Sequence, residues 1–294
     1  MKPVISVCVP TFNQEKYIEK CLESILDQDI EVPYEIIVAD DCSTDATREI
    51  LMGYGERYEG IIKLILNNEN IGPTQNTLLA RSHARGKYIC HCDGDDFFYR
   101  EKLRVQFDFL EQNPEYVVAW HDVHLYRECG DLLDNDEAKL KKNIDLKLED
   151  LLAFGSWGAN SSLMYRYNGI PFETDKYLMY DFEFSLILLD NSKGVLLSNK
   201  LGGYRVGSVG SLTSSLLSNR VNRQRLDQLR LWAAFVRNRK EYRKFVGFFS
   251  LITLFKSLLK REKISKKYFT GIIYLMYFAH GPSLINSVLK KISK

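Results

Sequence analysis

The sequence predicts an α/β protein with a mostly parallel sheet flanked by helices. Two observations carry this prediction. Short β-prone apolar runs alternate with amphipathic helical stretches over residues 1–125, and each apolar run ends in polar residues. At 294 residues, with 45% hydrophobic and 27% charged side chains, the chain can bury a substantial core. These values exclude wholesale disorder, a collagen-like repeat and a disulfide-stapled miniprotein.

The alternation starts with a strand at residues 4–9 and a helix whose apolar positions begin at Tyr17. Further strands are expected at residues 35–39, 61–66, 88–92 and 117–123, separated by helices at residues 45–54, 74–84 and 101–112. Strands joined through helices of this length run parallel, and such sheets bind ligands beyond the carboxyl ends of their strands. The strand ends are therefore where a functional site is expected.

Acidic residues occupy those ends. Asp40 and Asp41 close the second strand, and Asp93-Gly94-Asp95-Asp96 closes the fourth. Neither a dinucleotide-binding glycine motif after the first strand nor a P-loop is present in the sequence. Carboxylates at a strand end would repel a pyrophosphate unless a divalent cation lay between them, and oxygen ligands suit Mg²⁺ or Mn²⁺. The pattern predicts a metal-bridged nucleotide.

Four segments in order resemble the family-2 glycosyltransferases, which have the GT-A (Rossmann-like) fold. They are Val7–Asn13, Ile36–Asp45, Asn70-Ile71-Gly72 with Asn76, and Ala84–Ile89 leading into Asp93–Asp96. Two softer matches follow, at Tyr180–Glu183 and at Tyr204-Arg205. The likeness covers about residues 3–215.

The resemblance implies a nucleotide-sugar donor, with UDP as the expected nucleotide. Asp41 would accept a hydrogen bond from the base, with Pro10 and Thr11 lining the same pocket and Gly72 and Asn76 also on the donor side. The carboxylates Asp93, Asp95 and Asp96 would bind Mn²⁺ or Mg²⁺ on the donor diphosphate.

The catalytic residue that the resemblance implies is Asp181. It would take the proton of an acceptor hydroxyl as that hydroxyl attacks the anomeric carbon from the face opposite the leaving group, which gives inversion. Arg205 would add positive charge near the phosphates. The reaction expected is therefore transfer of one sugar to a saccharide hydroxyl.

Two other functions stay open on the sequence. A sugar-1-phosphate nucleotidyltransferase shares an acidic metal site at strand ends, although Asn13-Gln14-Glu15-Lys16 stands where its glycine-rich phosphate loop is expected. A non-catalytic saccharide- or nucleotide-binding module on a decayed enzyme scaffold is favoured by Tyr180 and Gly207, which depart from the family pattern.

Three further segments invite an interpretation. Cys90-His91-Cys92 is not expected to bind zinc, because alternate strand residues point to opposite faces. The segment 130–149 is expected to be a loop with a helix opening near Leu148, and residues 156–162 suit a sugar platform or a packed turn. His121 and Asp122 are expected at the end of a strand.

Charge divides the chain into two parts. Residues 220–294 hold 18 Lys and Arg against 3 Asp and Glu, whereas residues 1–219 hold 22 against 35. We expect a transferase domain at 1–219, with a donor half at about 1–125 and an acceptor half at about 126–219, followed by a C-terminal helical extension at 220–294. The extension is expected to be a basic, amphipathic region.

The basic region predicts where the protein works. Apolar runs edged with Lys and Arg suit an anionic membrane surface, which predicts a peripheral anchor that brings the site to a lipid-linked saccharide. Packing on the domain, or a homodimer, is the alternative, and no motif supports nucleic-acid binding. Six cysteines in mostly apolar runs, with no signal peptide or spanning helix, predict a cytoplasmic protein at the cytosolic membrane face.

Overall fold

The computed structural model describes residues 2–133, 140–154, 158–167 and 181–207. Two compact units are present: Met1–Leu146 with Trp157–Ser214, and Lys147–Ser156 with Ser215–Lys294. The first unit contains all of the described strands, whereas helix α5 (Leu148–Phe154) belongs to the second. The predicted basic region at 220–294 lies outside the described residues.

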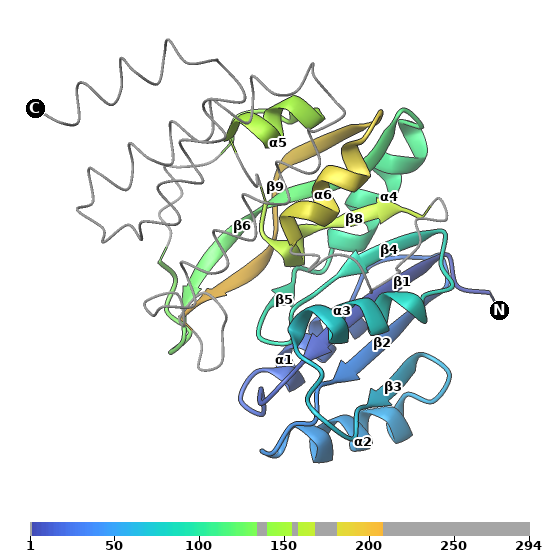
Figure 1. The fold of residues 1–294 in the computed structure, drawn as a ribbon, viewed down its shortest axis with the longest axis vertical. Helices are drawn as coiled ribbons and strands as arrows, with labels where there is room; N and C mark the ends of the chain where they lie inside the picture. Colours follow the sequence, from blue (N-terminus) through green and yellow to red (C-terminus); the bar gives the residue numbers. More distant parts are fainter. Residues whose placement is uncertain (1, 134–139, 155–157, 168–180, 208–294) are drawn as a thin grey trace, which may run out of the picture. The chain divides into compact units, whose positions relative to one another are not determined.

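The described strands form one sheet in the order β3-β2-β1-β4-β8-β6-β9-β5, with β7 paired to β9 (Figure 1). The strands are β1 (Ile5–Thr11), β2 (Tyr34–Asp40), β3 (Ile62–Leu66), β4 (Tyr88–His91), β5 (Phe97–Phe98), β6 (Tyr116–Arg127), β7 (Ile144–Leu146), β8 (Met164–Arg166) and β9 (Lys193–Val206). Strands β1 to β4 pair in parallel, and so do β6 and β9. The predicted fold class is confirmed, with antiparallel pairs added by β5, β7 and β8.

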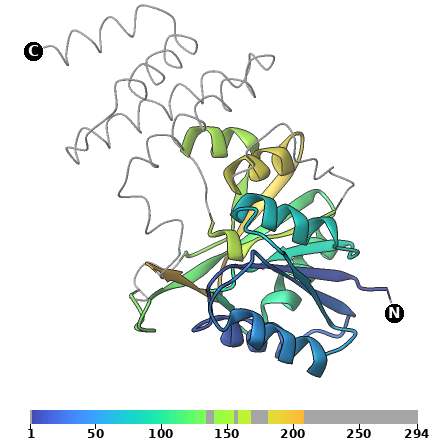
Figure 2. The ribbon, with the colours of Figure 1, turned by 60° about the horizontal axis from the view of Figure 1, so that its bottom comes forward.

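Helices cover both faces of this sheet. They are α1 (Ile18–Leu26), α2 (Thr47–Arg57), α3 (Pro73–Ser82), α4 (Lys102–Gln112) and α6 (Asp181–Leu189). Figure 2 shows α1 and α2 on the side of the sheet opposite α3 and α6. The guanidinium of Arg81 on α3 lies 4.1 Å from the ring of Phe184 on α6, which places these two helices together.

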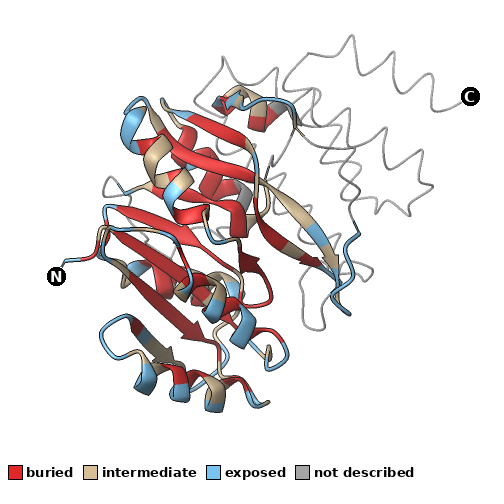
Figure 3. Ribbon diagram, turned by 180° about the vertical axis from the view of Figure 1, so that it is seen from behind, coloured by how far each residue is buried: buried red, intermediate tan, exposed pale blue. Residues whose placement is uncertain are grey.

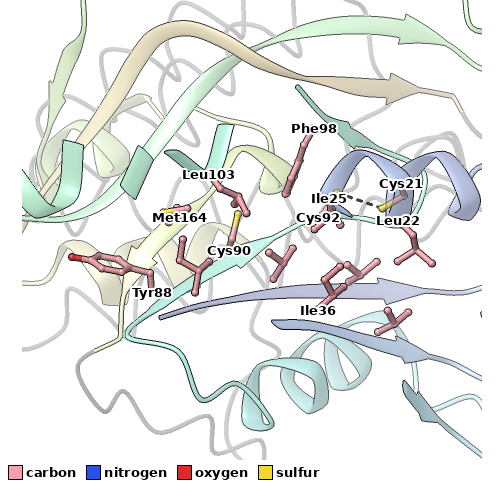
Figure 4. Close-up of a cluster of buried hydrophobic side chains, with 14 of the residues drawn as sticks. Cys21, Leu22, Ile25, Ile36, Tyr88, Cys90, Cys92, Phe98, Leu103 and Met164 are labelled. Carbon is pink, nitrogen blue, oxygen red and sulfur yellow. Dashed lines mark hydrogen bonds between the residues drawn. The ribbon is translucent and has the colours of Figure 1, made fainter. Parts of the chain in front are cut away.

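The main core lies on the side of α1 and α4. Because side chains alternate along a strand, Ile5, Val7 and Val9 of β1 face this cluster, together with Cys90 of β4. Figure 4 shows the cluster, in which Sγ of Cys21 lies 3.6 Å from Sγ of Cys92. Figure 3 shows β1, β2 and β4 buried along nearly all of their length. None of the six cysteines forms a disulfide.

Two expectations for the second half of the chain are wrong. The strand predicted at residues 117–123 is longer, because β6 continues to Arg127. His121 and Asp122 therefore lie within β6 rather than at its end. In the segment 130–149 the helix expected to open near Leu148 is confirmed by α5, but the stretch before it is not only a loop, since it contains β7. Among the described helices, none has the length and apolar character needed to cross a bilayer.

Candidate active site

The carboxyl ends of β1, β2 and β4 meet at one edge of the sheet, where the sequence predicts the site. Thr11 is in register with Asp40, so β1 and β2 end side by side. Strand β4 ends at His91, and Asp93–Asp96 follow directly. The parallel pairing thus places both acidic segments at one edge (Figure 1).

The loops after β1 and β2 are bonded to each other. The N–H of Asn13 donates to Oγ of Ser43 at 2.9 Å, and the N–H of Thr44 donates back to Oδ1 of Asn13 at 2.8 Å. Asn13 and Cys42 have left-handed backbones, with φ of 53° and 62°. Asn tolerates this region, whereas Cys adopts it at a cost. Each loop therefore fixes the other.

Asp41 supports the loop that leads into α3. Its side chain is buried, and its Oδ1 and Oδ2 accept the N–H groups of Ile71 and Gly72 at 2.7 and 3.0 Å. Gly72 precedes α3 with φ of 89°, a backbone conformation that favours glycine. An ionised carboxylate has about four acceptor positions, so Asp41 retains capacity for a further donor.

Asn76 uses both ends of its amide within the fold. It is 1% exposed, its Nδ2 donates to the carbonyl of Ala39 at 2.7 Å, and its Oδ1 accepts from Asn67 at 3.0 Å. These bonds join α3 to the ends of β2 and β3. Pro10 and Thr11, which are also predicted donor contacts, lie at the end of β1, where the N–H of Gly94 donates to the carbonyl of Pro10 at 3.2 Å.

The acidic segment Asp93–Asp96 contains carboxylates in different surroundings. The side chain of Asp93 is 36% exposed, whereas Asp96 is buried and its Oδ1 accepts the N–H of Arg205 at 2.8 Å. Oδ2 of Asp96 accepts the hydroxyl of Ser161. Burial and the neighbouring charges of Asp95 and Asp93 hold the pKa of Asp96 well above its usual range. A positive charge beside these carboxylates would relieve the repulsion.

The donor set for a metal is limited. Among the described residues, no group of three or more His, Cys, Asp or Glu side chains is arranged to hold a metal ion. Asp96 is buried and uses both oxygens within the fold, whereas the side chain of Asp93 is 36% exposed, so Asp93 is the predicted ligand best placed for that role. Mg²⁺ is commonly held by one or two carboxylates, with substrate phosphates and water completing its shell. The partly exposed Asp93 fits that arrangement, and Asp95 stays a predicted ligand.

Arg205 lies in β9 and contacts the acidic segment through main-chain groups. Its guanidinium Nε donates to the carbonyl of Asp95 at 3.0 Å, and Nη1 lies 3.3 Å from the carbonyls of Arg127 and Glu128. The guanidinium also lies 4.5 Å from the ring centre of Tyr17. These contacts join the acidic segment to β6 and β9.

Sequence reasoning missed the supports beneath the acidic segment. Ser161 lies in the short helix Asn160–Ser162, where its Oγ accepts the N–H of Asp93 at 2.9 Å. The small, polar composition of residues 156–162 was the available signal, and Asn160–Ser162 form a bonded turn. His91 is fully buried with Nε2 2.9 Å from Oδ1 of Asp93.

Asp181, the predicted base, is the first residue of α6. Its side chain lies outside the described residues. His121 is buried, with Nδ1 2.6 Å from the carbonyl of Asp122. Burial and the Lys102 charge hold the pKa of His121 well below its usual value, so its ring is neutral at pH 7.

The sheet and its acidic edge define a glycosyltransferase fold, and comparison with known proteins agrees. Residues 6–160 match glycosyl transferase family 2, and the chain belongs to that family. The family assignment confirms the resemblance of the sequence motifs.

Relatives and solved structures extend this comparison. An uncharacterized protein of Mycobacterium tuberculosis is 37% identical over 171 residues, which cover 57% of this chain and 49% of that protein. A poly(ribitol-phosphate) β-N-acetylglucosaminyltransferase, TarS of Staphylococcus aureus, is 34% identical over 114 residues, covering 38% of this chain and 20% of TarS. The chain thus spans half or less of these relatives.

A crystal structure of TarS in complex with UDP-GlcNAc resembles this fold. The TM-score is 0.70 at 19% sequence identity, with 98% of this chain and 83% of that chain covered. At this identity the likeness concerns the fold.

Proposed function

We propose that this protein is a metal-dependent, inverting glycosyltransferase. It transfers a sugar from a UDP-sugar to a hydroxyl of a saccharide acceptor, in the assembly of a cell-surface polysaccharide. The observation that carries the proposal is the acidic segment Asp93–Asp96 at the carboxyl edge of a family-2 sheet. Hydrogen bonds from Asp93 to Ser161 and from Arg205 to Asp96 hold this segment in place. The UDP-GlcNAc complex of TarS favours UDP as the nucleotide.

The donor is proposed to bind where β1, β2 and β4 end. Asp41 accepts a hydrogen bond from the base, beside Pro10 and Thr11, and Gly72 and Asn76 keep the neighbouring loop in place. Asp93 and Asp95 hold Mn²⁺ or Mg²⁺ together with the donor diphosphate. That cation would neutralise charge on the leaving diphosphate.

Asp181 is proposed as the general base at the start of α6. The acceptor hydroxyl oxygen forms a bond to the anomeric carbon while the bond from that carbon to the diphosphate oxygen breaks. The bonding electron pair leaves with the nucleoside diphosphate, and the hydroxyl proton moves to the Asp181 carboxylate. Attack opposite the leaving group inverts the anomeric centre.

The direct test uses the full chain with a panel of UDP-, GDP- and TDP-sugars and Mn²⁺, and measures release of nucleoside diphosphate. Asp181→Asn is expected to keep donor affinity within a few fold and to lower turnover by about 10²–10⁴. Asp95→Asn is expected to abolish metal-dependent binding of UDP in calorimetry. A chain that binds UDP yet releases none from any sugar donor would be a binding module, and transfer would be excluded.

The acceptor is proposed to be lipid-linked, at the cytosolic face of a membrane. The support is the charge of residues 220–294, where 18 basic residues stand against 3 acidic ones. Each basic residue near an anionic bilayer contributes about 1 kcal/mol. The full chain should sediment with anionic vesicles at 50 mM salt and lose binding toward about 500 mM because of screening. Failure to sediment at low salt would refute membrane binding.

A further inference from the structure

His91 has no packing reason to be a histidine. It is the last residue of β4 and is fully buried, on the face opposite Cys90 and Cys92, which face the main core. An apolar side chain would fill this position without the cost of burying a polar ring. Within the described part of the chain, Nδ1 of His91 has no hydrogen-bond partner. The contacts at Nε2 are therefore the ones that compensate for burial.

Those contacts join His91 to the acidic segment. Nε2 lies 2.9 Å from Oδ1 of Asp93 and 2.6 Å from Nδ2 of Asn160. A carboxylate only accepts hydrogen bonds, so the contact with Asp93 assigns a hydrogen to Nε2. Two donors cannot share one hydrogen bond, so we assign the Asn160 amide the reverse orientation, with its oxygen in place of Nδ2 beside the ring.

The position of Asp93 itself is held from two sides. Its N–H donates to Oγ of Ser161 at 2.9 Å, so the main chain is anchored to the same short helix that contains Asn160. The carboxylate is held by His91 through Oδ1, while 36% of the side chain remains exposed. Oδ2 lies 3.3 Å from Oγ of Ser161, a longer contact, so the protein holds Oδ1 most closely and leaves the carboxylate partly exposed.

We propose that His91 is a positioning residue that holds the Asp93 carboxylate in one orientation toward the donor's diphosphate and cation. This inference rests on the proposed function of the acidic segment. A carboxylate free to turn about its side-chain bonds presents its oxygens in several directions, and binding must then select one of them. Loss of such a supporting partner typically costs about 10–100-fold in metal affinity.

Calorimetry of the full chain with UDP and Mn²⁺ tests the role. His91→Leu is expected to weaken binding about 10–100-fold. His91→Gln should stay within a few fold of wild type, because its amide nitrogen can reach the place of Nε2. Ile89→Ala, two residues earlier on the same face of β4, is the matched control for lost packing and should leave affinity unchanged.

A double-mutant cycle separates positioning from general damage. If His91 acts through Asp93, His91→Leu should cause no further loss of affinity in the Asp93→Asn background. Additive losses, or unchanged affinity in His91→Leu, would overturn the proposal.

Nitrogen NMR of the histidine rings gives an answer that does not depend on donor binding. The chain has five histidines, so the His91 signals are identified by their loss in His91→Gln. The Nε2-protonated form is expected, with a shift of its resonance in Asp93→Asn. A ring protonated at Nδ1 alone, or a spectrum insensitive to Asp93→Asn, would refute the contact. Absence of UDP binding in the wild type, with the NMR result intact, would refute the proposed function and leave the contact established.

Discussion

Replacing Arg205 with methionine is expected to destabilise the fold by releasing the acidic segment from β9. The side chain is 7% exposed, its Nε donates to the carbonyl of Asp95 at 3.0 Å, and its Nη1 lies 3.3 Å from two further carbonyls. Methionine keeps much of the apolar length of arginine. It removes the guanidinium from those three carbonyls, of which that of Arg127 keeps the N–H of Gly130 at 2.9 Å.

The magnitude follows from these contacts. A hydrogen bond from a charged donor contributes about 1.5–3 kcal/mol, and the 3.0 Å bond to Asp95 is counted in full. The two 3.3 Å contacts share one nitrogen and are counted together as one weak bond. The guanidinium over the Tyr17 ring adds about 0.5–2 kcal/mol. After the packing that methionine restores, the expected loss in unfolding free energy is about 3 kcal/mol.

Urea unfolding measures this loss. With a slope of about 3 kcal/mol per molar, the midpoint should fall by about 1 M. Arg205→Lys is the matched control, because it keeps the charge and the apolar stem but lacks the planar set of donors, and it should fall between wild type and Arg205→Met. Calorimetry with UDP and Mn²⁺ is run on the same samples.

The opposite pattern would refute the reasoning. A midpoint within about 0.3 M of wild type, together with a more than tenfold loss of UDP affinity, would make Arg205 a phosphate contact rather than a support. That outcome would agree with the role that the family resemblance implies for this residue.

Substitutions at three other positions have expected outcomes in urea unfolding. Burial alone would raise the pKa of Glu35, but hydrogen bonds from Arg85 hold it below its usual range. The ionised Glu35 therefore stabilises the fold above about pH 4.3, and this stabilisation is lost as the pH falls through the pKa of the folded state. Glu35→Gln should therefore be less stable than wild type at pH 7, and the gap should close toward pH 2; a constant gap would contradict this. Cys42→Gly should raise stability by about 0.5 kcal/mol, since glycine adopts a φ of 62° without strain, whereas Cys42→Ala should not. Lys102 is fully buried, with Nζ 2.8 Å from Sγ of Cys90 and no ion pair to a described residue. Lys102→Met should therefore raise the unfolding free energy by about 2 kcal/mol. A loss of stability would show that the surrounding groups compensate for burial of the ammonium.

The sequence predicts the donor half of the fold well and the second half poorly, mainly because several strands of the second half are very short. Strands β1 to β4 each contain at least four apolar-rich residues before a polar end, which periodicity detects. Strands β5 and β8 contain two and three residues, too few to show a period. Strand β9 is interrupted by Gly203, where a Cβ would lie 2.3 Å from the ring of Phe97. That glycine allows close approach of β5 and masks the strand in the sequence.

The location of the candidate site could be predicted from the sequence, whereas the roles of its separate carboxylates could not. Its location follows from parallel strands that end in carboxylates, so the placement of Asp41 and Asp93 at one edge could be predicted. The separate roles of the carboxylates could not, because the bonds that decide them join residues far apart in the chain. Asp96 is bonded to Ser161, 65 residues away, and to Arg205, 109 residues away. No local pattern contains such pairings.

The donor-side loops are held by hydrogen bonds between the protein's own groups, and this affects how variants there are interpreted. Asp41 holds two N–H groups of the loop before α3, and Asp96 holds the N–H of Arg205. A site ordered by such bonds loses less freedom on binding, which favours affinity. Substitution of either residue therefore weakens binding by disordering the loop as well as by removing a donor contact. Asp93 differs, since its side chain is 36% exposed, with Oδ1 held by His91 and Oδ2 in a longer, 3.3 Å contact with Ser161. A change in affinity at Asp93, with stability unchanged, is the one that reports on the donor directly.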